Sequence, residues 1–172
     1  TTWSKGIKGL RALGEFEIRA NQRVLVSATS LWLLYDVAAE QLKRIPGEMA
    51  EAYEIESGQA LDWDLAKWKP AAGFPVQTTV PITTRASDFD IYGHVNHAVY
   101  LDYIDTALDR CHENHTRLGE VKVAFSKQIS RQVDWVEVRI GSDREARMIS
   151  IGKNNTLFAL AECRPMITPK HY

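Results

Sequence analysis

Two carboxylates, a histidine and an asparagine lie close together in one short stretch. This stretch, Asp88-Phe89-Asp90-Ile91-Tyr92-Gly93-His94-Val95-Asn96, ends a predicted strand, forms a turn-rich loop and opens a predicted helix. A carboxylate on a loop just before a helix lies near unpaired backbone N–H groups, and the helix N-terminus favours developing negative charge. Hydrolysis at a carbonyl carbon needs a base or nucleophile and a donor for the carbonyl oxygen. The pattern favours that chemistry, with Asp90 as the carboxylate.

The other residues of the stretch have two interpretations each. His94 could orient a substrate carbonyl or the base, or it could bond only to backbone. Asn96 is typical of a helix N-cap, and Asp88 of a side chain that fixes a turn by bonding nearby backbone. Gly93 permits a tight backbone and close approach of a substrate.

The elements around the stretch predict one helix wrapped by strands. Thr78 to Ala86 reads as a strand that leads into the loop. Apolar residues then recur at helical spacing, which predicts one buried face: Val99, Tyr100, Tyr103, Ile104, Ala107 and Leu108. Four strands are predicted after the helix, at 120–130, 135–142, 146–152 and 156–165, with Asn154-Asn155 as a tight turn between the last two. A long helix wrapped by one antiparallel sheet is an α+β arrangement.

The first part of the chain predicts strands without a long helix. Residues 7–20 and 23–35 read as two strands joined by a turn at Asn21-Gln22. Asp36 is a plausible N-cap for a helical turn through Lys43, and 48–53 reads as another helical turn. From 57 to 77 the periodicity is lost. We therefore predict three parts: residues 1–57, a linker at 58–77, and a second unit at 78–172.

The stretch from Asp88 to Tyr100 resembles the signature of hot-dog acyl thioesterases, D-x-D-x-x-G-H-V-N-N-A-x-Y, with His97 in place of the second Asn. Other segments resemble the end of the first hot-dog unit of acyl-ACP thioesterases: Trp3, the strand around Arg19, Ala28-Thr29-Ser30-Leu31-Trp32 and Lys43-Arg44-Ile45-Pro46. The resemblance implies a tandem hot-dog fold whose first unit is incomplete at its N-terminus. It also implies hydrolysis of fatty acyl-ACP to free fatty acid and ACP, as in fatty acid biosynthesis.

The resemblance extends to the site residues. It implies that Asp90 is the catalytic base or nucleophile, that His94 assists it, and that the helix N-terminus near Asn96 stabilises the oxyanion. Tyr92, Gly93 and Asn96 are then expected at the substrate.

The chain departs from the plant-type enzymes at three positions. These enzymes carry Asn at the position of Tyr92, and adjacent Glu and Cys on the strand after the helix, where Gln128 and Ile129 align. A Cys nucleophile is therefore not expected, and Gln128 becomes a candidate for holding a water by hydrogen bonds. Tyr-Gly-His is typical of single-unit acyl-CoA thioesterases, which keeps acyl-CoA as an alternative substrate.

Composition and charge exclude several classes of function. The formal net charge is −1, without the basic surplus expected of a nucleic-acid binder. No apolar run is long enough for a membrane span. The two cysteines, Cys111 and Cys163, do not make a disulfide framework, and reduced thiols favour a cytoplasmic location. His112, Glu113 and His115 near Cys111 lack a second ligand pair. We predict no metal site and no cofactor.

Other functions remain as alternatives. A hot-dog dehydratase is disfavoured because its patterns carry a Pro that is absent between Asp90 and His94. A non-enzymatic acyl-thioester-binding protein would need an effector module, and no helix-turn-helix is visible. An inactive remnant of a thioesterase is a further alternative, and a homodimer is left open. For an acidic ACP the predicted docking residues are Lys122, Lys127 and Arg131.

Overall fold

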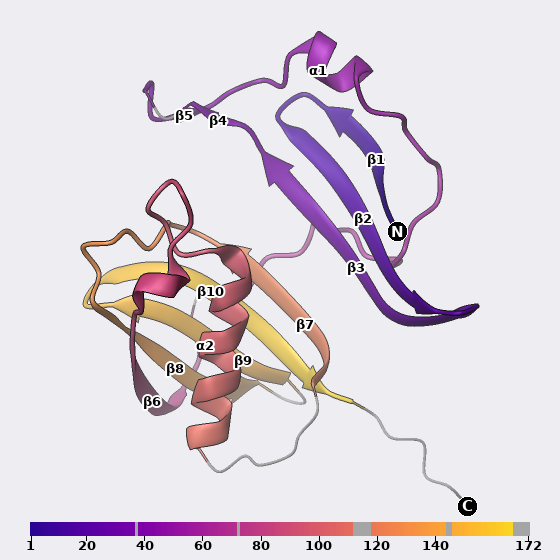
Figure 1. Ribbon diagram of the computed structural model, residues 1–172. Coiled ribbons are helices and arrows are strands. Elements are labelled where there is room, and N and C mark those ends of the chain that lie inside the picture. Colours follow the sequence, from indigo (N-terminus) through magenta and orange to yellow (C-terminus); the bar gives the residue numbers. More distant parts are fainter. Residues whose placement is uncertain (37, 72, 112–117, 144–145, 167–172) are drawn as a thin grey trace, which may run out of the picture. The chain divides into compact units, whose positions relative to one another are not determined.

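The computed structural model describes all residues except 37, 72, 112–117, 144–145 and 167–172 (Figure 1). The chain divides into two compact units, Thr1–Trp68 and Lys69–Tyr172. Among the described residues, no helix is long and apolar enough to span a membrane.

The second unit is a five-stranded antiparallel sheet with one long helix. Its strands are β6 (Val76–Thr83), β7 (Leu118–Phe125), β8 (Trp135–Asp143), β9 (Ala146–Lys153) and β10 (Thr156–Pro165), in the order β6-β8-β9-β10-β7. A short 3-10 turn, η1 (Ala86–Asp88), follows β6, and α2 (His97–Arg110) packs against the sheet (Figure 1). The predicted α+β arrangement is confirmed.

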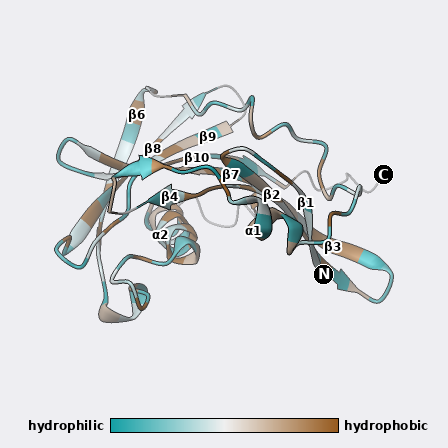
Figure 2. Ribbon diagram, turned by 90° about the horizontal axis from the view of Figure 1, so that it is seen from above, coloured by the Kyte–Doolittle hydropathy of each residue, from teal (hydrophilic) through white to brown (hydrophobic). Residues whose placement is uncertain are grey.

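The apolar face of α2 forms one side of the core. Tyr100, Tyr103, Ile104 and Ala107 are buried, while Val99 and Leu108 are partly buried against the same core. The sheet supplies the other side with alternating residues of the central strands: Val136, Val138, Ile140, Ile149 and Ile151. Each fully buried large apolar side chain contributes about 1.5–3 kcal/mol. The opposite face of α2 carries exposed carboxylates, and Figure 2 shows the resulting mixture of polar and apolar residues along the helix.

The first unit is a three-stranded antiparallel sheet with short peripheral elements. The sheet is β1 (Thr2–Lys8), β2 (Arg11–Ala20) and β3 (Arg23–Leu33), in that order. The hairpin β4 (Tyr35–Asp36)–β5 (Gln41–Leu42) and the single helical turn α1 (Gly47–Glu51) follow. Glu15 on β2 is buried, and its carboxylate accepts hydrogen bonds from Thr29 Oγ1 (3.0 Å) and from the backbone N–H of Ala60 (2.9 Å). This carboxylate therefore holds the segment around residue 60 on the sheet.

Three predicted elements are wrong in detail. The strand predicted over 7–20 is interrupted at Gly9-Leu10, where Gly9 has a φ of 65° and turns the chain from β1 to β2. Asp36 does not begin a helix. Its Oδ1 accepts hydrogen bonds from the N–H groups of Ala38 and Ala39, which closes the β4–β5 turn instead. The same side-chain chemistry serves a turn and a helix N-terminus equally well, so the residue type alone could not separate them.

The strand predicted over 120–130 also ends early. β7 stops at Phe125, because the N–H groups of Ser126 and Lys127 both donate to the carbonyl oxygen of Phe158, at 2.8 and 3.2 Å. Two successive donors on one acceptor cannot continue a regular ladder. Gln128, predicted on this strand, therefore lies beyond its end.

Candidate active site

Asp90 lies in the loop between η1 and α2, and its two carboxylate oxygens differ in their hydrogen bonds. Oδ1 accepts hydrogen bonds from the backbone N–H groups of Tyr92 (2.9 Å) and His94 (3.1 Å). The loop closes around it, because Asp90 N donates to His94 O at 2.8 Å and Gly93 N donates to Asp90 O at 3.1 Å. Oδ2 accepts no hydrogen bond from the described residues of this unit. One oxygen therefore holds the loop, and the other is available for chemistry.

Asp88, two residues earlier, is buried, with 2% of its surface exposed. Its Oδ2 accepts hydrogen bonds from Tyr103 Oη (2.6 Å) and from the N–H of Arg85 (2.8 Å), and its Oδ1 accepts from Arg85 Nε (3.1 Å). Its backbone oxygen accepts from Asn96 N at 2.9 Å. Burial, followed by the hydrogen bond to this carboxylate, raises the pKa of Tyr103 far above its ordinary value, so that hydroxyl stays protonated.

The remaining motif residues surround Asp90 in distinct ways. Gly93 has a φ of 75°, a left-handed conformation that glycine adopts without strain and that lets the loop turn back. Tyr92 lies at the loop tip with 78% of its surface exposed. His94 is half-buried, and its backbone forms an isolated antiparallel bridge with Ser130. The side-chain roles predicted for Tyr92 and His94 stay predictions.

Asn96 is the N-cap of α2, since its Oδ1 accepts a hydrogen bond from Ala98 N at 2.9 Å. Its backbone oxygen accepts from Val99 N at 3.0 Å. Two N–H groups of the first turn are thus already paired with Asn96. What the start of α2 offers an anion is chiefly the positive end of its dipole.

Gln128 is exposed and lies in the segment that follows β7. This segment runs beside the motif loop, because Val95 N donates to Ile129 O at 2.9 Å and His94 pairs with Ser130. The segment also contacts α2 through the hydroxyl of Tyr100, which accepts from Ile129 N at 3.3 Å and donates to Lys127 O at 3.5 Å. The motif loop, the start of α2 and the Gln128 segment therefore meet in one place.

Three cations were predicted as docking residues, and they differ in their surroundings. Lys122 on β7 forms ion pairs with Glu120 (3.0 Å) and Glu162 (3.9 Å), and only 16% of its side chain is exposed. Lys127 and Arg131 are exposed. The guanidinium of Arg131 lies over the Phe89 ring, 5.1 Å from its centre, beside the motif loop. Of the three, Arg131 is the one that contacts a residue of the motif.

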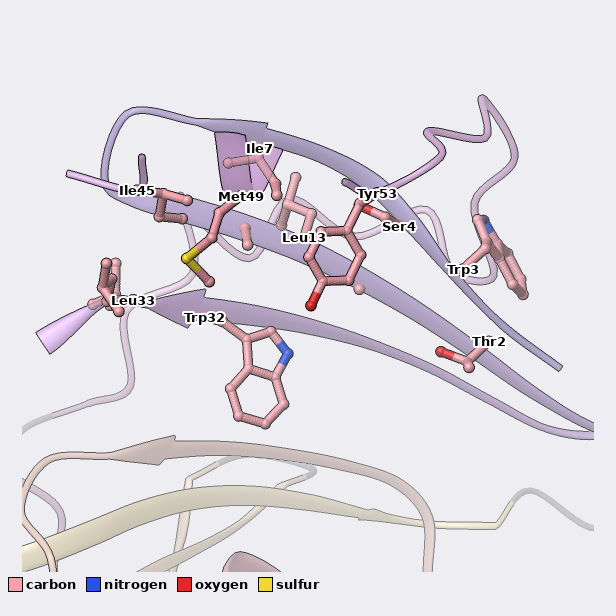
Figure 3. Close-up of a pocket in the computed structure, with 13 residues that line it drawn as sticks. Thr2, Trp3, Ser4, Ile7, Leu13, Trp32, Leu33, Ile45, Met49 and Tyr53 are labelled. Carbon is pink, nitrogen blue, oxygen red and sulfur yellow. The ribbon is translucent and has the colours of Figure 1, made fainter. Parts of the chain in front are cut away.

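The first unit holds an apolar pocket of about 480 Å³ on its sheet (Figure 3). Trp32 and Leu13 line it from β3 and β2, and Met49 and Tyr53 line it from α1 and the residues just after it (Figure 3). Its lining is mostly apolar. A pocket of this size is in the range of small-molecule sites.

Cys111 and Cys163 are thiols rather than a disulfide. Cys163 is fully buried, and burial, followed by the nearby charge of Glu162, raises its pKa to about 12. Such a thiol does not form a nucleophilic thiolate near neutral pH. No group of three metal-ligating side chains occurs among the described residues. His112, Glu113 and His115 lie outside them.

Sequence reasoning did not identify Tyr100 and Tyr103 as part of the site. The helical stripe predicted Tyr100 and Tyr103 as core residues but not the use of their hydroxyls. A buried tyrosine normally finds a hydrogen-bond partner, and that rule was the available signal. The partners themselves come from positions 15 and 29 residues away in the chain, which only the fold brings together.

Comparisons with known proteins agree with this geometry. Residues 75–156 match the family model of the acyl-ACP thioesterase C-terminal domain. Curated protein sequences gave no match. An acyl-ACP thioesterase from Bacteroides thetaiotaomicron has a similar structure, with a TM-score of 0.73 and 17% identity over 95% of this chain. A 12:0-ACP thioesterase from Umbellularia californica gives a TM-score of 0.79 and 17% identity over 96% of this chain.

The chain spans 66% of the length of each of these two proteins. At such low identity the likeness shows the fold, which is the hot-dog fold that the motif predicted. The predicted resemblance to acyl-ACP thioesterases is confirmed as well. Residues 75–156 of this protein are therefore similar to the acyl-ACP thioesterase C-terminal domain, and the chain has the hot-dog fold.

Proposed function

We propose that the protein is a thioesterase that hydrolyses fatty acyl-ACP to free fatty acid and ACP, with Asp90 as the catalytic carboxylate. The observation that carries the proposal is the difference in hydrogen bonding between the two carboxylate oxygens of Asp90. Its Oδ1 is held by the N–H groups of Tyr92 and His94, while Oδ2 accepts no hydrogen bond from the described residues around it. Because the hydrogen bonds to Oδ1 fix the whole carboxylate, Oδ2 is held in one position before the substrate reacts. Little reorganisation is then needed at the moment of reaction.

The carboxylate can act by either of two routes. As a general base, Oδ2 takes a proton from water while the water oxygen bonds to the thioester carbonyl carbon. The tetrahedral intermediate then loses the carrier sulfur, which leaves as a thiol with that proton. As a nucleophile, Oδ2 bonds to the carbonyl carbon and expels the thiolate, and water then cleaves the mixed anhydride and restores the carboxylate.

The neighbouring residues fit supporting roles. In the proposal, Gln128 holds the water by hydrogen bonds, since its segment lies against the motif loop through Val95 and Ile129. The start of α2 at Asn96 stabilises the oxyanion by its dipole. His94 orients the carbonyl or the base, and Tyr92 and Gly93 contact the substrate at the loop tip.

The substrate class has two supports besides the family. The pocket of the first unit is apolar and of a size for an alkyl chain, which suits a fatty acyl group. An acidic carrier protein would be attracted by the exposed cations Lys127 and Arg131. Acyl-CoA is the alternative substrate, because Tyr92-Gly93-His94 is the form found in single-unit acyl-CoA thioesterases.

The test is Asp90→Asn on the full chain, measured with acyl-ACP and acyl-CoA of graded chain length. Asn keeps an oxygen that accepts from Tyr92 and His94, so the loop should persist while the reactive oxygen becomes an amide nitrogen. We expect kcat to fall by about 10²–10⁴ with KM nearly unchanged. The matched control is Asp102→Asn on the exposed face of α2, which should not alter kcat. Hydrolysis by folded Asp90→Asn at the wild-type rate would refute the proposal.

Two further measurements resolve the open points. A higher kcat/KM for acyl-CoA than for acyl-ACP would reassign the carrier and leave the role of Asp90 intact. Turnover in heavy-oxygen water followed by mass spectrometry of the Asp90 peptide separates the two routes. Label enters the Asp90 carboxylate only when that carboxylate is the nucleophile and water attacks the anhydride at the Asp90 carbonyl carbon. Labelled Asp90 would therefore establish the nucleophilic route, whereas label in the fatty acid alone is common to both routes.

A further inference from the structure

The Tyr100 hydroxyl contacts the peptide groups on both sides of Gln128. Ile129 N donates to it at 3.3 Å, and it donates to Lys127 O at 3.5 Å. The first group belongs to the peptide bond after Gln128, and the second to the peptide bond before it. The longer contact is weak, so the bond from Ile129 is the main one. The backbone at Gln128 is therefore bracketed by one side chain of α2.

The ring that carries this hydroxyl is fixed in place. Tyr100 is 1% exposed, and its ring meets Phe125, the last residue of β7, edge to face with centroids 5.2 Å apart. The ring of His97 stacks on that of Phe125, with the two ring centroids 4.1 Å apart. Edge-to-face and stacked aromatic pairs of this kind are favourable beyond their buried area. The direction of the hydroxyl is thus set by the helix and the sheet together.

The hydroxyl keeps its proton over the whole neutral range. Burial raises the pKa of Tyr100 to about 12. A neutral hydroxyl can accept from Ile129 and donate to Lys127 at once, which a phenolate could not do.

The segment needs such a support at this point. Residues 126 and 127 are held by Phe158 O, and residues 129 and 130 by Val95 and His94. Gln128 lies between these two anchors, beyond the end of the β7 ladder. Without the hydroxyl, the peptide groups flanking Gln128 could rotate and change the direction of its side chain.

We propose that Tyr100 is a positioning residue whose hydroxyl fixes the Gln128 backbone, so that the Gln128 amide stays aimed at the water used by Asp90. The inference rests on the proposed function, because it assigns Tyr100 to the same site. Tyr100 itself does not touch substrate. Its effect on turnover should therefore pass entirely through Gln128.

The test is a double-mutant cycle with Tyr100→Phe and Gln128→Ala on the full chain. Phe keeps the buried ring and removes only the hydroxyl. We expect Tyr100→Phe to lower kcat about tenfold with KM within about twofold, as a small misplacement of a reactive group would do. In the Gln128→Ala background the same change should have no further effect. Tyr103→Phe is the matched control for the coupling, since it removes a buried hydroxyl from the same helix face but one that bonds Asp88, so any effect it has on kcat should be independent of Gln128 and persist in Gln128→Ala.

A second measurement reads the contact directly. Hydrogen exchange at the Ile129 amide should accelerate in Tyr100→Phe and not in Tyr103→Phe. Independent, multiplying effects of Tyr100→Phe and Gln128→Ala would overturn the inference, and so would an unchanged Ile129 amide. If Gln128→Ala alone leaves kcat intact while Asp90→Asn abolishes it, the inference fails and the proposed function stands. If Asp90→Asn retains full activity, the proposed function fails, and the inference fails with it.

Discussion

Replacing Asp88 with alanine should destabilise the second unit by about 2–5 kcal/mol. The change removes the acceptor of two donors, Tyr103 Oη at 2.6 Å and Arg85 N at 2.8 Å. A buried donor left without a partner, here the Tyr103 hydroxyl, costs about 1–3 kcal/mol, and the part-buried N–H of Arg85 adds about 1–2 kcal/mol, which together give the predicted range. The third bond, from Arg85 Nε, adds little, because that side chain is 65% exposed and can turn to water.

Urea unfolding followed by circular dichroism measures this loss of free energy of unfolding. The informative comparison is with Asp90→Asn, which keeps the oxygen that holds the loop and should cost below about 1 kcal/mol. Tyr103→Phe combined with Asp88→Ala should show a coupling energy of about 0.5–3 kcal/mol, since the two residues share one hydrogen bond. The reasoning is refuted if Asp88→Ala unfolds like wild type, or if Asp90→Asn is the more destabilising change.

Three other outcomes follow from the structure. Gly141→Ala should destabilise by about 1–3 kcal/mol in the same urea assay, because an added Cβ would overlap the carbonyl oxygen of Pro75; a wild-type midpoint would contradict this. Stability should fall as pH rises from about 9 to about 12, because burial raises the pKa of Tyr100 and Cys163 to about 12 and the unfolded chain releases these protons first. Cys163→Ala should flatten that slope, and an equal slope would argue against it. Arg131→Glu should raise KM for acyl-ACP more than for a short neutral thioester, with a difference that shrinks in salt; equal effects would remove the docking role.

The second unit was predictable because its patterns are local. The apolar stripe from Val99 to Leu108 fits one helical face, and Asn154, with a φ of 53°, turns the chain between β9 and β10 as the Asn-Asn pair predicted. The errors occur where one residue type serves two local structures. Asp36 closes a turn with the same hydrogen bonds that would begin a helix. Gly9 breaks a strand that its neighbours would have continued.

The site was predictable only in outline. The motif places Asp90 on a loop before a helix, and the structure has it there. The different roles of the two oxygens of Asp90 depend on backbone N–H groups of a loop that turns back at Gly93, where φ is positive. The partners of Asp88 and of the Gln128 segment are tyrosines from the buried face of α2, at distances along the chain that no local pattern encodes.

The two carboxylates of the motif are two residues apart and have opposite surroundings, and this difference links the core to the chemistry. Asp88 is buried under α2, where Tyr103 holds its side chain and Asn96 holds its backbone oxygen. Asp90 follows on the half-buried side of the same short loop, with one oxygen left open. The position of Asp90 Oδ2 thus depends on α2, the helix that forms the core, through its hydrogen bonds to Asp88. On the proposed role of Asp90, changes in the core that shift α2 should therefore alter kcat before they alter folding, because a reactive oxygen tolerates less displacement than a packed side chain does.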